Sequence, residues 1–138
     1  MSTAPGLLTA LVLLAIGFLH VYWALAGPMA SAVAVPSIGG RASFKPTATA
    51  TFAVAAALII AAWQVAAQSR ALPGLVPAWV TLWICRALAA IFVARAIGDF
   101  RLVGFFKTVK DTPFAYWDTR LYSPLCVLLA LGCLSVSL

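Results

Sequence analysis

One arginine of this chain lies deep inside an apolar segment, where a charge needs a partner or a ligand. Arg86 follows Leu75 by eleven residues in the segment 75–97, and the acidic residues Asp99, Asp111 and Asp118 all lie outside such segments. A guanidinium near the middle of a bilayer costs at least about 2.5–3.5 kcal/mol on insertion scales. We therefore expect Arg86 to face the protein interior and to meet carbonyls, polar side chains, water or an anion.

Other side chains capable of chemistry gather at one predicted membrane face. In an enzyme, His20 with Asp99 or Asp118 would act as acid and base, and Arg86 or Arg95 would stabilise developing negative charge. No Ser-His-Asp set, glycine-rich phosphate loop or metal motif specifies a reaction, so the sequence predicts no metal and no cofactor. The remaining residues expected to contact a ligand are Arg101, Tyr22, Trp23, Trp117 and Tyr122.

Each of these residues also has a purely structural interpretation. His20 could be a hydrogen-bonding packing residue, and Arg86 could be satisfied by helix carbonyls. Asp99 could form an interfacial ion pair with Arg95 or Arg101, and Asp118 could cap a helix. The tryptophans and tyrosines alone would make an ordinary interfacial aromatic belt.

Composition identifies the solvent of this chain as lipid. Of its 138 residues 64% are hydrophobic and 9% are charged, which leaves too little polar surface to cover a water-soluble domain. Four stretches approach or exceed the ~20 apolar residues that cross a bilayer, namely 7–27, 47–68, 75–97 and 121–138. The sequence therefore predicts an all-α single domain, 1–138, with four transmembrane helices in one bundle and an interfacial segment between the third and fourth helices.

Basic residues in the loops predict the orientation. The first and third loops hold or border six lysines and arginines, whereas the second carries only Arg70. This bias places loops one and three in the cytoplasm and both termini outside, in a bacterial cytoplasmic (inner) membrane. No lysine or arginine precedes the first apolar stretch, which favours a retained span over a signal peptide.

Helical periodicity predicts which faces pack together. Small residues such as Gly17 follow one stripe of the first helix with His20. Ala53, Ala57, Ala61 and Gln64 follow one stripe of the second. We expect these two stripes to meet. Helix rise puts His20 about 10 Å and Arg86 about 16 Å from one membrane face, so we expect both to line one cavity. The cysteines Cys85, Cys126 and Cys133 are expected to be small packing residues.

The loops differ in character. Residues 98–120 interleave aromatic and basic side chains, which is typical of a segment lying in the membrane interface. Asp118 or Thr119 is the expected cap of the fourth helix, with Pro124 in its first turn. The first loop is rich in proline, glycine and serine, so we expect irregular structure there.

Three segments carry a resemblance to a known family: HVYWALAG at 20–27, FVARAIGDFRLVGFFK at 92–107 and FAYWDTRLYSPL at 114–125. Over essentially its whole length the chain resembles an uncharacterised bacterial family of four-helix integral membrane proteins, catalogued as a domain of unknown function. The resemblance implies the helix count and no catalytic role. It also implies that certain positions matter: His20, Trp23, Arg95, Asp99, Arg101, Asp118 and Tyr122.

The function that fits this pattern is binding of a small amphiphilic or anionic, lipid-like molecule in a pocket that opens toward loops one and three, with or without a reaction. An oligomeric transporter or channel that selects anions with Arg86, and an accessory subunit of a membrane complex, are the alternatives. Expected partners are membrane lipids and a second copy of the chain. Nucleic acid is not expected, because cytoplasmic, lipid-facing loops explain the net charge of +6.

Overall fold

Three helices of the protein are long and apolar enough to cross a membrane. The computed structural model describes residues 3–138, and within them these helices are α1 (Thr3–Ala26), α2 (Ala48–Gln68) and α3 (Ala78–Ile97). The predicted stretches 7–27, 47–68 and 75–97 coincide with them to within a few residues. Their outer faces expose large apolar side chains, among them Leu11, Phe18, Ile60 and Trp83, as lipid-facing helices do.

The C-terminal part of the chain is one continuous helical path of three segments. These are α4 (Pro113–Trp117), the π-helical turn η2 (Asp118–Tyr122) and α5 (Ser123–Ser135). Thr112 caps α4, because its Oγ1 accepts a hydrogen bond from the Ala115 amide at 3.0 Å, and Pro113 fits the first turn. The expected start near residue 121, with Asp118 or Thr119 as the cap, is therefore wrong.

Pro124 accounts for the π-helical turn. A proline inside a helix cannot donate the usual backbone hydrogen bond, and its ring clashes with the carbonyl four residues earlier. The helix widens to a π-helical turn just before Pro124, so that the Ser123 amide donates to the Asp118 carbonyl, five residues earlier. This widening lets the helix continue through Pro124, and it sets the direction in which Asp118 projects.

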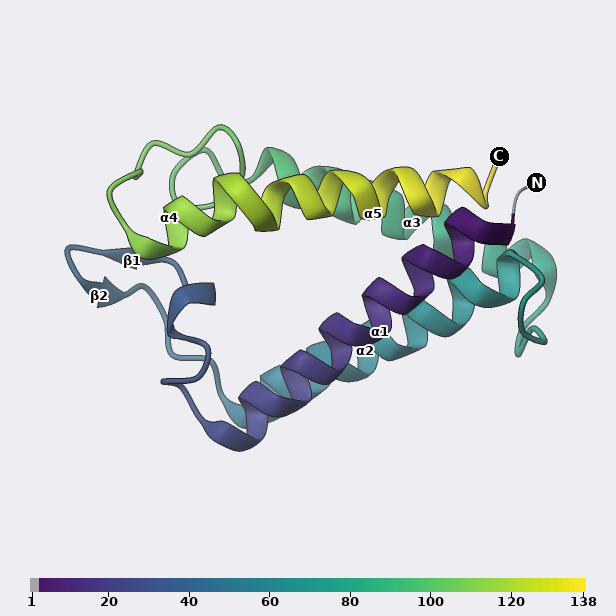
Figure 1. The fold of residues 1–138 in the computed structure, drawn as a ribbon, viewed down its shortest axis with the longest axis horizontal. Helices are drawn as coiled ribbons and strands as arrows, with labels where there is room; N and C mark the ends of the chain where they lie inside the picture. Colours follow the sequence, from purple (N-terminus) through teal and green to yellow (C-terminus); the bar gives the residue numbers. More distant parts are fainter. Residues whose placement is uncertain (1–2) are drawn as a thin grey trace.

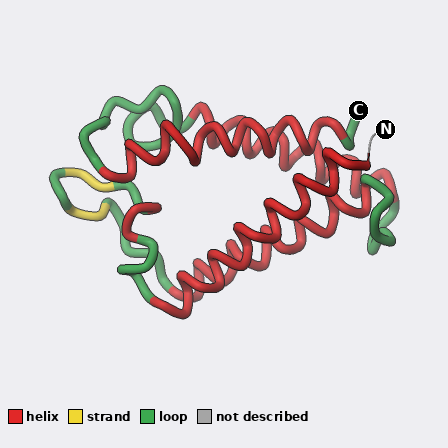
Figure 2. Tube along the Cα trace, in the orientation of Figure 1, coloured by secondary structure: helices red, strands yellow, loops and turns green. Residues whose placement is uncertain are grey.

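The helices form an open wedge of two antiparallel pairs (Figure 1). α1 packs along α2 and α3 packs along α5. The two pairs meet at the end that carries both termini and the α2–α3 connection, and they diverge toward the first and third loops (Figures 1 and 2). The first and third loops therefore lie at the same end of the helix pairs (Figure 1), and the divergence of the pairs toward these loops was not expected.

Small residues allow the two pairs to touch at the narrow end. A Cβ atom at Gly6 of α1 would lie 2.6 Å from the Ser69 Cβ and 2.7 Å from the Val136 Cγ1. A Cβ atom at Gly132 of α5 would collide with the Thr9 hydroxyl. Both helix backbones therefore approach as closely as glycine permits, as is common where membrane helices cross.

The α1–α2 contact follows the predicted small-residue stripe only in part. Gly17 packs against Ile59 and the Ala55 carbonyl, and Gln64 is buried as expected. Ala53 and Ala57, however, are exposed. The buried face of α2 combines Ala61 and Gln64 of the predicted stripe with Ala55, Ala62, Val65 and Ala66. The prediction followed a stripe beside the true one, because an all-apolar helix gives periodicity little contrast.

The first loop is more ordered than the sequence indicated. A 3₁₀ turn, η1 (Ala32–Ala34), precedes a small antiparallel hairpin in which β1 (Ser37–Ile38) pairs with β2 (Arg41–Ala42) (Figure 2). The two residues between the strands are Gly39 and Gly40, with φ of 57° and 78°. Two positive φ values are what a tight hairpin turn requires, so the glycines that suggested irregularity in fact close the hairpin.

The glycine contact at the narrow end gives the first prediction. Gly132→Val should destabilise the fold by about 1–3 kcal/mol, the usual effect of overpacking, because Thr9 cannot turn away without breaking its hydrogen bond to the Pro5 carbonyl at 2.8 Å. Melting curves in detergent measure this. Ala90→Val, at an exposed position of α3, is the control, and an equal melting temperature for the two variants would contradict the close contact.

Candidate functional site

A buried carboxylate bound by two cations lies at the wide end of the wedge. Asp118 is fully buried, and its Oδ1 accepts a hydrogen bond from Arg95 Nη2 at 2.9 Å while its Oδ2 accepts one from Lys107 Nζ at 3.0 Å. The Lys107 side chain is 1% exposed. The helix α3, the third loop and the π-helical turn are therefore joined at a single carboxylate, in a region of low dielectric constant.

The third loop closes around the same carboxylate. The Gly104 amide donates to Asp118 Oδ2 at 2.8 Å, and Lys107 Nζ donates to the Gly104 carbonyl at 2.9 Å and to the Thr119 hydroxyl. Gly104 has φ of 87° and packs on the Ile97 carbonyl, where no side chain fits. The sequence indicated Lys107 only as one residue of a basic loop, because nothing in its spacing predicts the ion pair with Asp118.

The ion cluster of Arg95, Lys107 and Asp118 carries a surplus of one positive charge. Arg95 Nη1 is buried and has no hydrogen-bond partner within the described residues, and the same holds for the Ser123 hydroxyl. Both carboxylate oxygens of Asp118 accept hydrogen bonds from protein groups, so the ion cluster is suited to a structural role.

Asp99 organises the start of the third loop. Its Oδ1 accepts hydrogen bonds from the amides of Arg101, Leu102 and Val103 at 3.0, 2.8 and 3.0 Å. These amides stabilise the charged form, so the pKa of the Asp99 carboxyl lies below its ordinary value. Within residues 3–138 Asp99 forms no ion pair, and the expected pairing with Arg95 or Arg101 is therefore not found.

A cavity of about 370 Å³ opens at the wide end between α1, α2 and the first loop. Its walls include His20, Trp23, Val35, Phe44 and Val54, so it is mostly apolar with a few polar groups. The His20 and Trp23 rings meet edge to face, with centroids 4.9 Å apart. Of the predicted site residues, these two line the cavity.

The hydrogen bond of His20 fixes what its ring can offer a ligand. Nδ1 lies 2.8 Å from the Ile16 carbonyl, and because a carbonyl only accepts, Nδ1 carries the proton. In the neutral ring Nε2 is then an acceptor, and in the protonated ring it is a second donor. His20 can therefore bind a hydroxyl in one state and an anionic oxygen in the other.

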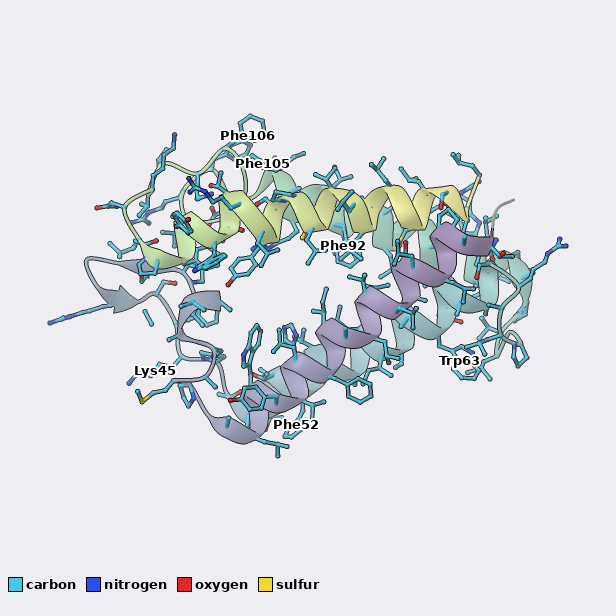
Figure 3. The ribbon with its side chains drawn as sticks, viewed as in Figure 1. Lys45, Phe52, Trp63, Phe92, Phe105 and Phe106 are labelled. Atoms are coloured by element: carbon cyan, nitrogen blue, oxygen red, sulfur yellow. The ribbon has the colours of Figure 1, made fainter. Side chains whose placement is uncertain are left out.

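Lys45 is a cavity residue that the sequence analysis did not select. It belongs to the first loop, lies at the wide end of the wedge (Figure 3) and lines the cavity with Thr47 and Thr51. Both threonines already serve α2: Thr47 Oγ1 accepts from the Ala50 amide, and Thr51 Oγ1 donates to the Thr47 carbonyl. Lys45 forms no ion pair in the described part of the chain, which leaves its ammonium group available.

Arg86 does not join His20. Its side chain is exposed on α3, its Nη2 donates to the Ser137 carbonyl at 3.2 Å, and its Cζ lies 5.0 Å from the centre of the Trp83 ring. The expected inward orientation and the shared cavity with His20 are wrong, whereas a carbonyl partner was expected and is found. The side chain reaches toward the narrow end, where a cation also stabilises the C-terminal carbonyls of α5.

The other predicted ligand residues lie outside the cavity. Tyr122 donates its hydroxyl to the Val33 carbonyl at 3.3 Å, which connects the π-helical turn to η1. Tyr22, Arg101 and Trp117 are exposed. In the described residues the cysteines are free thiols, and no group of three or more His, Cys, Asp or Glu side chains could hold a metal ion.

A protein-family model described as "Protein of unknown function (DUF3995)" matches residues 13–133 of the chain. The match extends from the middle of α1 to the last turn of α5, and it includes His20, Lys45 and the whole ion cluster. No curated protein and no solved structure matches the chain. The predicted resemblance to an uncharacterised domain family is thereby confirmed.

The second prediction concerns the ion cluster. Asp118→Asn leaves Arg95 and Lys107 near each other without a counter-charge, and breaking a buried pair in this way costs about 3–5 kcal/mol. We expect a large fall in the detergent melting temperature. Asp111→Asn, at an exposed position, is the control. The double variant Asp118→Asn with Lys107→Met should recover part of the loss, and additive effects of the two changes would contradict the buried pair.

The third prediction separates the two roles considered for Arg86. Because its guanidinium binds a C-terminal carbonyl, Arg86→Met should lower the melting temperature, by less than Asp118→Asn does. Lys110→Met, at an exposed loop position, serves as the control. An Arg86→Met protein that melts at or above the parent temperature would mean that the bond to Ser137 contributes no stability.

Proposed function

The chain belongs to the DUF3995 family of proteins of unknown function, and we propose that it is a multi-pass membrane protein that binds the head group of an anionic amphiphile in the cavity beside His20 and Lys45. The proposal includes a fourth span formed by the path from α4 to α5. It places the first and third loops in the cytoplasm of a bacterium, where the basic residues of these loops meet lipid phosphates.

One observation carries this proposal: a mostly apolar cavity at the wide end of the wedge is lined by His20 and Lys45. His20 offers Nε2, and Lys45 offers a cation without a protein counter-charge. Pockets for small ligands commonly combine apolar walls with a few such groups. An ammonium group beside an imidazole suits a phosphate or carboxylate head group, while the apolar walls suit the start of a hydrocarbon chain.

Binding is favoured over catalysis because the carboxylates are occupied. Asp118 is bound by two cations and an amide, and Asp99 is bound by three amides. A general acid or base needs a free position within hydrogen-bond reach of the reacting proton. Of the three residues considered for acid–base chemistry, only His20 lines the cavity, so neither Asp99 nor Asp118 can exchange a proton with it there.

Transport and an accessory role have less support. Anion selection by Arg86 at the midplane would require this residue to line a pathway, yet its guanidinium is bonded to the Ser137 carbonyl near the narrow end. An accessory subunit would need no cavity with free polar groups. The position of Arg86 fits a purely structural role whether the protein is a transporter or an accessory subunit. No separate observation therefore supports either alternative.

The fourth prediction tests the head-group site. The full chain in phosphatidylcholine nanodiscs should bind dodecyl phosphate more tightly than empty nanodiscs do, and inorganic phosphate should not bind measurably. Lys45→Gln should weaken binding of dodecyl phosphate about tenfold, as expected for one charged hydrogen bond, and His20→Ala should weaken it several-fold. Isothermal titration or the change in tryptophan fluorescence measures the dissociation constant.

The matched control is Arg41→Gln, because Arg41 is an exposed cation of the same loop that does not line the cavity. Equal losses in Arg41→Gln and Lys45→Gln would indicate general surface attraction and would overturn the proposal. Unchanged affinity in both His20→Ala and Lys45→Gln would do so as well. Binding of inorganic phosphate as tight as that of dodecyl phosphate would mean that the site recognises an anion without its chain.

A further inference from the structure

A second cavity of about 410 Å³ lies where the two helix pairs begin to separate, between α1 and α5. Leu8 and Val12 line it from α1, and Leu125, Leu128 and Leu129 line it from α5. Leu8 and Leu128 are about two-thirds exposed, at 65% and 64%, so the cavity opens toward the surroundings of the protein. In a bilayer these surroundings are hydrocarbon, and a lipid chain can enter from the side.

The side-chain hydroxyl groups of this second cavity already donate their hydrogen bonds within the protein. The Thr9 hydroxyl donates to the Pro5 carbonyl at 2.8 Å, and the Ser135 hydroxyl donates to the Gly132 carbonyl at 2.7 Å. Both bonds lie within one helix, so the hydroxyl donors are used before any ligand arrives. A cavity of satisfied hydroxyls and leucines is suited to hydrocarbon, because a polar occupant would lose its own hydrogen bonds there.

Both cavities lie on one face of α1. At 100° per residue, Pro5, Leu8, Val12, His20 and Trp23 fall within about 120° of the helix circumference. Ile16 lies on the same face between the two cavities, is half-buried and packs against the core. Phe92 of α3 points toward the space between the helix pairs (Figure 3). Apolar side chains such as Ile16 and Phe92 therefore border the space between the two cavities.

The spacing along α1 sets the length of chain that would join the cavities. The level of Val12 lies about 12 Å from His20, and the level of Pro5 lies about 22 Å from it, at a rise of ~1.5 Å per residue. The half-thickness of the hydrocarbon core is about 15 Å. A chain that starts at His20 therefore has to be long and extended to fill the second cavity.

We infer that the second cavity holds the hydrocarbon chain of the amphiphile whose anionic head group binds beside His20 and Lys45, and that the protein thereby selects long-chain over short-chain ligands. This inference rests on the proposed head-group site and adds the chain class to it. The head group binds at the wide end, and the chain runs along α1 toward the crossing with α5.

The fifth prediction uses chain length as the readout. Octyl phosphate should reach only the first cavity, and hexadecyl phosphate should reach both. Leu8→Trp and Leu128→Trp each place a larger side chain at an exposed edge of the second cavity. We expect each to weaken binding of hexadecyl phosphate about tenfold in phosphatidylcholine nanodiscs and to leave octyl phosphate unchanged. Leu11→Trp, on an exposed face of α1 outside the cavity, should change neither.

The outcomes distinguish the inference from the proposed function. If both tryptophan variants keep the parent preference for hexadecyl phosphate while His20→Ala still weakens both ligands, the chain site is wrong and the head-group site stands. If His20→Ala changes neither ligand, the head-group site fails and the chain site fails with it. Dissociation of an oligomer by Leu8→Trp, seen by light scattering, together with unchanged ligand affinity would assign the cavity to a second copy and overturn the inference.

Discussion

The buried carboxylate of Asp118 fixes the wide end of this molecule. A buried carboxylate without partners would be strongly unfavourable, and here Arg95, Lys107 and the Gly104 amide satisfy it. Because these partners come from α3 and from two positions of the third loop, one charge orders a segment of mixed aromatic and basic composition. Tyr122 extends this order to η1 through the Val33 carbonyl.

The wedge shape follows from where close packing is possible. At the narrow end Gly6 packs against the Val136 side chain and Gly132 packs against the Thr9 side chain, so the two helix pairs approach closely. Toward the other end α1 presents His20 and Trp23, which are bulky, and the pairs separate. In water such an opening would collapse, but in a bilayer its apolar walls can be covered by hydrocarbon. The open wedge is therefore a structure suited to lipid as its solvent.

The two ends of the wedge consequently have different chemistry. The narrow end is held by glycine contacts and by Arg86, which binds the Ser137 carbonyl. The wide end combines an ordered third loop with a first loop whose Lys45 remains without an ionic partner in the described residues. Rigid positioning by the ion cluster on one side and an available cation on the other is a reasonable basis for ligand binding.

The sequence by itself determined the helical class, three membrane-length helices and the family. These follow from local properties, namely apolar length and motifs. It could not determine that Arg86 is exposed, that Lys107 pairs with Asp118 or that Lys45 lines a cavity with His20. On a helix that is apolar all round, periodicity does not distinguish a protein-facing stripe from a lipid-facing one. The partners of Asp118 come from segments 11 and 23 residues away in the chain. Only the tertiary structure decides such contacts, because they depend on how the loop closes and on the π-helical turn that Pro124 imposes.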